Sequence, residues 1–167
     1  ALREVALALG EPPATRGYAP SVFSNLPQLG ESAGKGAHPE GSMSAIYTVL
    51  AEGDDQQDPV VDTARAILDG HIVLTRELAE RGHYPAIDIA ASISRCMAQV
   101  ITPEHMQAAR ALKASMARHA RVRDLIPLGA YVPGADPITD RAVQLHAPIE
   151  AFLCQGTKEE APMGPCI

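Results

Sequence analysis

Three prolines mark where helices begin in this chain. Asp58–Pro59, Thr102–Pro103 and Asp136–Pro137 each place a capping residue directly before proline, and an apolar helical pattern follows each pair. An Asp or Thr side chain accepts hydrogen bonds from the first free N–H groups of a helix, and proline suits the first helical position because it lacks such a group. The helices predicted from these signals run from residue 58 to about 68, from 102 to about 125, and from 136 to a C-terminal end within residues 151–156.

The region before residue 95 alternates short apolar runs with short helical patterns. Residues 42–50 and 71–74 are predicted to be buried strands, because they are almost continuously apolar and contain β-branched side chains. Alternation of strands and helices is typical of an α/β sheet. The remaining predictions are helices at residues 1–9, 21–34 and 76–82, a surface loop at 35–41, an extended and then loop-like stretch at 83–95, and a frayed tail after 156.

The pattern predicts two domains. Residues 1–100 are expected to be α/β and residues 101–167 to be helical, with no internal repeat in either part. The hydrophobic content of 46% is sufficient for a core, although aromatic side chains make up only 4% of the chain.

Charge and cysteine content exclude several classes of protein. The net charge of −6 argues against a nucleic-acid partner, because phosphate backbones require a basic surface. Cys96, Cys154 and Cys166 have neither disulfide-framework nor zinc-site spacing, and no histidine pair has metal-ligand spacing, so we expect a reducing compartment and no metal site. No apolar run is long enough to span a bilayer, which predicts a soluble, cytoplasmic protein.

Three ordered motifs carry a resemblance to a known family. GEPPATRGYAPSVF, GSMSAIYTVLAEGDDQQDP and ARAILDGHIVLTRELAERGHYPAIDIAASISR together resemble the flagellar type III export ATPase, a relative of the subunits of rotary ATP synthases. The similarity extends from Leu2 to about Gln155 and favours the flagellar branch over the virulence injectisome branch. It implies the C-terminal half of a RecA-like P-loop nucleotide domain, followed by an all-helical C-terminal domain.

The resemblance also implies that the chain is a C-terminal fragment. In the family, the phosphate-binding loop and the residues that hold ATP with Mg lie upstream of the segment that matches Ala1. No G-x-x-x-x-G-K-[ST] motif occurs here, and Gly34–Lys35–Gly36 does not match it. The full-length protein is therefore expected to hydrolyse ATP, whereas the fragment alone is not.

Arg95 is the predicted catalytic residue. The resemblance implies that it reaches across a subunit interface to the nucleotide of a neighbour. A guanidinium group suits this role because it is permanently charged and offers planar donors to the equatorial phosphoryl oxygens. Spacing alone favours a surface arginine that caps a helix or pairs with Asp88.

Three residues are predicted to contact the nucleotide base. Tyr18 lies on a proline-rich loop and offers a flat face for adenine, and the resemblance places an aromatic residue there. The alternative is that Tyr18 packs on a sheet edge. Gln155 matches a polar residue that contacts the adenine edge, and Phe152 lies in the same segment; the alternatives are an exposed Gln155 and a core Phe152.

Partners follow from the resemblance and from charge. The resemblance implies a homo-hexamer, with an export regulator, a stalk and chaperone–substrate complexes as partners, and peripheral association with the export gate at the inner membrane. The acidic loop at 52–58 is read as a solvated turn or a stalk contact. A basic side of the long helix is read as a solvated face or as a docking site for an acidic partner or an anionic membrane; it comprises Arg110, Lys113, Arg118, Arg121 and Arg123.

Two other functions stay open at this stage. Residues 101–167 could act mainly as an interaction module for chaperones, substrates or the stalk. The chain could also belong to an injectisome ATPase of the same family.

Overall fold

The computed structural model describes residues 2–36, 41–51 and 57–162. The chain divides into two compact units, 1–69 and 70–167. The predicted domain boundary near residue 100 is a different division and stays a prediction.

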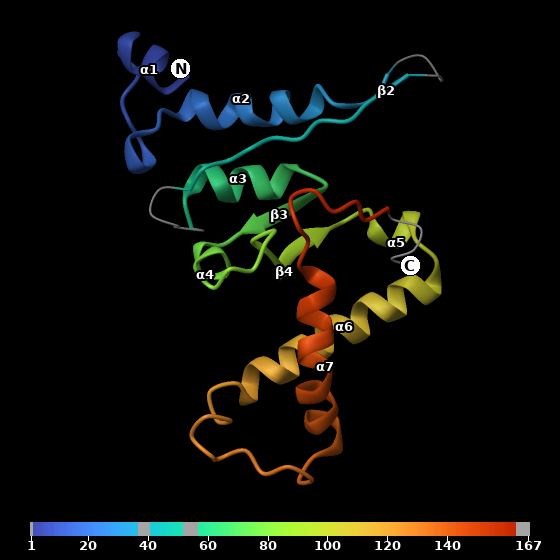
Figure 1. Ribbon diagram of the computed structural model, residues 1–167. Helices are drawn as coiled ribbons and strands as arrows, with labels where there is room; N and C mark the ends of the chain where they lie inside the picture. The colour runs from blue at the N-terminus through green and yellow to red at the C-terminus, as the bar shows by residue number, and fades with distance from the viewer. Residues whose placement is uncertain (1, 37–40, 52–56, 163–167) are drawn as a thin grey trace. The chain divides into compact units, whose positions relative to one another are not determined.

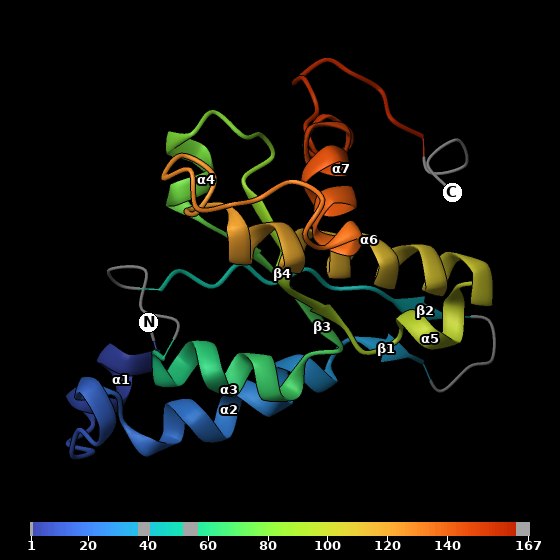
Figure 2. The same ribbon diagram turned by 90° about the horizontal axis from the view of Figure 1, so that it is seen from below.

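The first unit is built on three helices, of which two lie side by side. Helix α2 (Pro20–Glu31) runs along α3 (Pro59–Ile67), as Figures 1 and 2 both show. The helices approach closely at Gly30, where a Cβ atom would lie 2.8 Å from Cγ2 of Ile67. The other elements of this unit are α1 (Leu2–Ala8), a 3₁₀ turn (Thr15–Gly17), and the paired short strands β1 (Gly34–Lys35) and β2 (Ser42–Met43).

The predicted helix starts are confirmed wherever a capping residue precedes proline. Asp58 Oδ1 accepts hydrogen bonds from Val60 N and Val61 N at 2.8 and 3.4 Å. Thr102 Oγ1 accepts one from His105 N, and Asp136 Oδ1 accepts one from Ile138 N. The helices predicted at 1–9, 21–34 and 76–82 are also present.

The buried strand predicted at 42–50 is wrong. Only Ser42 and Met43 are in a strand, and Ile46 and Leu50 are 98% and 91% exposed. A strand needs a neighbour to pair its backbone and cover its side chains, and within the described residues β2 pairs only with the two residues of β1. Residues 52–56 of the acidic loop predicted at 52–58 lie outside the described residues.

The second unit joins an antiparallel ribbon to a pair of helices. Strand β3 (Gly70–Leu74) pairs with β4 (Ile87–Ser94), and α4 (Arg76–Glu80) lies between them in sequence. The strand predicted at 71–74 is present but not fully buried, because only Val73 is buried and Ile72 and Leu74 are exposed. The short α5 (Met97–Val100) leads into α6 (Pro103–Val122), and α7 (Pro137–Leu153) packs against α6 (Figure 1).

Two histidine rings stack within the second unit. His119 of α6 and His146 of α7 have ring centroids 3.6 Å apart with an angle of 14° between the planes. Burial of His119, followed by the charges of His146 and Arg123, lowers its pKa from the usual 6.5, and Glu150 opposes this shift. The pair therefore packs best when His119 is neutral.

Acid is expected to destabilise this helix pair. Because the folded-state pKa of His119 is lowered, the unfolded chain takes up more protons below about pH 6.5, and the contribution of neutral His119 to stability is lost as pH falls from there through the folded pKa. We expect the melting temperature of the full-length protein to fall between about pH 7.5 and about pH 5.5, and to fall less in His119→Gln. His105→Gln, on the same helix, is the control; an unchanged pH profile in His119→Gln would contradict the assignment.

No helix in the described ranges has both the length and the apolar character needed to cross a membrane.

Candidate functional site

Arg95 directly follows strand β4 and is exposed. Its position depends on how β4 pairs with β3. Gly70 pairs with Ser94 and His71 with Ile93, but the next paired residues are Val73 and Asp88. Residues 89–92 therefore form a bulge within β4. The order predicted for 83–95, extended and then loop-like, is wrong, because residues 83–86 lie outside the strand and 87–94 form it.

Side chains close this bulge with hydrogen bonds. Asp88 Oδ1 accepts from Ala90 N and Ala91 N, both at 2.9 Å. Ser92 Oγ donates to Asp88 O at 2.6 Å and accepts from Val73 N at 3.0 Å. Lys113 of α6 donates through Nζ to Ser92 O at 3.1 Å. The strand end that carries Arg95 is thus held from both β3 and α6.

Gln155 and Tyr84 lie together although they are far apart in sequence. Gln155 N donates to Tyr84 O at 2.8 Å, just after the last turn of α7. The Tyr84 side chain is 57% exposed, so its ring is available to a ligand. Gln155 is exposed as well, and its Nε2 donates to Glu159 O at 2.7 Å. Phe152, in the last turn of α7, is 58% exposed, so the alternative of a core residue does not hold.

A buried imidazole supports this corner of the second unit. His83 Nδ1 lies 3.1 Å from Glu150 Oε2 and 3.4 Å from Cys154 Sγ. Because His83 precedes Tyr84 and Cys154 precedes Gln155, these contacts fix the two segments on each other. The structure therefore brings Gln155, Phe152 and Tyr84 to one end of α7.

Tyr18 lies in the first unit, and its surroundings differ from the sheet edge that was the alternative to a base contact. Its ring packs on a small buried cluster of Ala6, Ala19 and Val22. Phe23 meets it edge-on with centroids 6.0 Å apart, and Arg3 Cζ lies 5.1 Å from the ring centroid. A guanidinium group over the ring is a favourable cation–π contact, which accounts for an aromatic residue here without a ligand.

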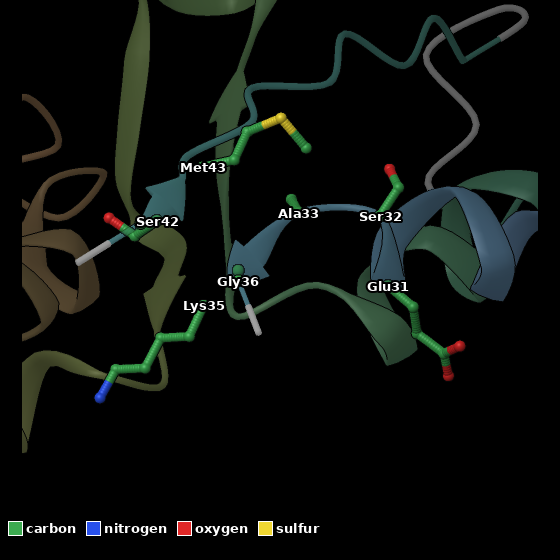
Figure 3. Close-up of a pocket in the computed structure, with 9 residues that line it drawn as sticks. Glu31, Ser32, Ala33, Lys35, Gly36, Ser42 and Met43 are labelled. Atoms are coloured by element: carbon green, nitrogen blue, oxygen red, sulfur yellow. The ribbon is translucent and has the colours of Figure 1, made fainter. Parts of the chain in front are cut away.

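A hollow in the first unit lies beside the short β1–β2 pair. Figure 3 shows Lys35 and Ser42 at its edge, with Met43 extending towards Ala33. Small residues line the hollow together with Glu31, Lys35 and Met43, and the described lining residues include no aromatic side chain that could face a base. Within the described residues no group of three or more His, Cys, Asp or Glu side chains is arranged to hold a metal ion.

Tyr84 is the residue that sequence reasoning missed. An aromatic residue that follows closely after the helix predicted at 76–82, at the start of the stretch predicted at 83–95, is a signal for a binding loop. Its relation to Gln155 depends on a backbone contact that spacing does not reveal.

Two family descriptions match the chain. Residues 1–94 match the nucleotide-binding domain of the ATP synthase alpha/beta family, and residues 101–167 match the C-terminal domain of the T3SS EscN ATPase. The first match alone covers more than half of the chain.

Curated relatives agree with these matches. The flagellum-specific ATP synthase of Salmonella typhimurium is 60% identical over 161 residues, which are 96% of this chain and 35% of that protein. The type 3 secretion system ATPase of Pseudomonas syringae pv. syringae is 50% identical over 163 residues, which are 98% of this chain and 36% of that protein. The chain thus spans about a third of the length of these relatives.

Solved structures show the same fold. The assembled ATPase EscN of enteropathogenic E. coli matches with a TM-score of 0.94 and 49% identity, over 99% of this chain and 40% of that one. EscN in complex with its central stalk EscO matches with a TM-score of 0.86. The predicted fold class, part of an α/β nucleotide domain followed by a helical domain, is confirmed. The chain belongs to the ATP synthase alpha/beta family, and its C-terminal region is a C-terminal domain of the type III secretion ATPase kind.

Proposed function

We propose that this chain is part of an ATP-hydrolysing motor subunit that energises flagellar type III protein export. The exposed Arg95, at the end of a strand held by a structured bulge, is the observation that carries the proposal. The names of the relatives, flagellum-specific ATP synthase and type 3 secretion system ATPase, support the reaction class.

In this proposal Arg95 acts on the nucleotide of the neighbouring subunit in a homo-hexamer. Its guanidinium stabilises charge on the transferring phosphoryl group, and the bulge and Lys113 hold the strand end in place. ATP with Mg supplies the phosphoryl group and the metal charge. The chain spans about a third of the length of its relatives, and we propose that the ligands of the phosphates and of the metal belong to the remaining part of the full-length protein.

The base of the nucleotide is proposed to bind at the end of α7. Gln155 offers an amide to the adenine edge, and Phe152 adds apolar surface. Tyr84 supplies the ring face in this arrangement, because it is exposed and its backbone contacts Gln155. Tyr18 remains a candidate for the same role, and variants separate the two tyrosines.

Tyr84→Ala is expected to weaken ATP affinity by roughly tenfold, since stacking of a base on an aromatic ring contributes about 1–3 kcal/mol. Tyr84→Phe keeps the ring and is expected to keep the affinity. Binding of a fluorescent ATP analogue to the full-length protein measures both. If Tyr18→Ala weakens binding and Tyr84→Ala does not, Tyr18 is the base platform.

The proposed hydrolysis is tested by its dependence on assembly. Because Arg95 acts between subunits, phosphate release per subunit is expected to rise with the concentration of full-length protein. If the rate per subunit is the same for the monomer and the hexamer, Arg95 does not act on the nucleotide of a neighbouring subunit.

The partners and location are proposed on the same basis. We propose a stalk partner, because EscN was solved with its central stalk EscO, and further propose an export regulator and chaperone–substrate complexes. The place of action is the cytoplasm, at the periphery of the inner-membrane export gate. The higher identity to the flagellar relative favours export of flagellar proteins over injectisome cargo, and restoration of swimming in a strain lacking its flagellar ATPase tests this choice.

A further inference from the structure

Helices α6 and α7 enclose a groove of about 630 Å³ within the second unit. Alanines of α6 and branched apolar side chains of both helices line its floor, among them Leu112, Leu145 and Ile149. Ile138, at the start of α7, lines the groove and is 64% exposed. Apolar surface of this kind between two helices has the shape that receives the ridge of a third helix.

Three arginines flank this apolar floor. Arg118 and Arg121 come from α6 and Arg141 from α7, and no carboxylate is among the residues that line the groove. Arg118 Nη1 lies 3.4 Å from Asp136 Oδ2, so its charge is partly balanced. Arg121 and Arg141 form no ion pair within the described part of the chain.

The nearby carboxylates are engaged by other groups. Asp136 accepts hydrogen bonds from Thr139 Oγ1 at 2.5 Å and Ile138 N at 3.1 Å. Asp140 accepts from the Tyr131 hydroxyl and, at 2.9 Å, from Gly134 N. The guanidinium groups of Arg121 and Arg141 therefore lie at an apolar groove, and the nearby carboxylates of Asp136 and Asp140 accept hydrogen bonds from other groups.

We propose that this groove binds an acidic amphipathic helix of a partner protein. The apolar stripe of that helix fills the floor, and flanking Glu or Asp side chains pair with Arg121 and Arg141. Charge complementarity selects this occupant, because each of the two helices contributes a guanidinium group to the lining and no carboxylate is part of it, which matches a partner helix with carboxylates beside its apolar stripe. A concave apolar floor fits a helix better than a flat lipid surface. The proposal does not depend on nucleotide binding or hydrolysis.

A synthetic helix tests the groove directly. The probe is a fluorescent peptide of about 18 residues, with leucines at helical spacing and glutamates on both edges of the stripe. Fluorescence anisotropy with the full-length protein is expected to show binding that weakens as salt rises. The same peptide with lysine in place of every glutamate is expected not to bind.

Variants locate the binding. The double change Arg121→Glu/Arg141→Glu is expected to weaken binding of the acidic peptide at least roughly tenfold. Arg110→Glu, an exposed arginine of α6 that does not line the groove, is the matched control and is expected to bind normally. Ile138→Ser removes apolar contact without reversing charge and is also expected to weaken binding. All three variants are expected to keep the ATP affinity of the unaltered protein, which confirms folding and separates this test from the proposed function.

Several results overturn the proposal. One is equal binding of the two peptides, and another is equal loss in Arg110→Glu and the double variant. If the peptide does not bind but the double variant changes self-association in sedimentation, the groove receives a second copy of the chain. If only vesicles of phosphatidylglycerol bind, and the double variant loses them, the surface contacts lipid.

Discussion

Replacing Arg95 with alanine is expected to lower kcat for ATP hydrolysis by about 10³-fold in the full-length protein, with little change in ATP affinity. An arginine that stabilises the transferring phosphoryl group acts mainly in the transition state, so its loss appears in kcat. Arg95→Lys is expected to restore little of the rate, because an ammonium group cannot bridge two phosphoryl oxygens. Phosphate release and fluorescent-nucleotide binding measure the two quantities.

Mixed assemblies decide whether Arg95 acts in trans. Subunits with Arg95→Ala keep their phosphate-binding residues, and subunits inactivated in those residues keep Arg95. If the arginine acts on the neighbour, mixing the two inactive proteins recovers part of the activity. Arg81→Ala is the matched control, since Arg81 is exposed in the same unit and pairs with Glu77 at 3.3 Å. Full loss of hydrolysis in Arg81→Ala, or no recovery on mixing, would contradict the role of Arg95.

The helix starts could be predicted because their causes are local. Asp58, Thr102 and Asp136 each accept a hydrogen bond from an N–H group two or three residues ahead. The proline after each cap marks the first helical position. Such signals are contained in a few adjacent residues.

The strand predicted at 42–50 is wrong because the pairing and cover that a strand needs are not local properties of the sequence. An apolar run indicates that its side chains prefer burial, but pairing and cover come from other segments. Among the described residues Ile46 and Leu50 have neither. The ribbon β3–β4 formed because residues 70–74 and 87–94 supply each other with a partner.

The candidate site divides in the same way. The resemblance assigned the role of Arg95, but the sequence predicted a loop-like stretch before it, where the structure has strand β4. The bulge that positions it depends on Asp88, Ser92 and Lys113, which join three elements. Tyr84 was missed because its contact with Gln155 links segments on either side of α5, α6 and α7.

The close pairing at Gly70 leads to the second large effect. Gly70 pairs with Ser94, and a Cβ atom at Gly70 would lie 2.6 Å from Ile93 O and 3.2 Å from Ser94 Cα. Both are backbone atoms of β4, so they cannot rotate away as a side chain would. We expect Gly70→Ala to lower the free energy of unfolding by about 1–3 kcal/mol and to shift the strand end that carries Arg95.

Because Arg95 follows Ser94 directly, this shift is expected to reduce hydrolysis as well as stability. A displacement of about 1 Å in a catalytic group can lower a rate by about 100-fold. Gly41→Ala is the matched control: Gly41 has open space around its Cβ position and an ordinary φ. Chemical denaturation and phosphate release in the full-length proteins measure both effects. If Gly70→Ala lowers stability but keeps the full rate of hydrolysis, the pairing at Gly70 supports the fold without positioning Arg95. If stability and rate are both unchanged, the backbone of β4 can move at this pair, and the close approach does not constrain the strand end.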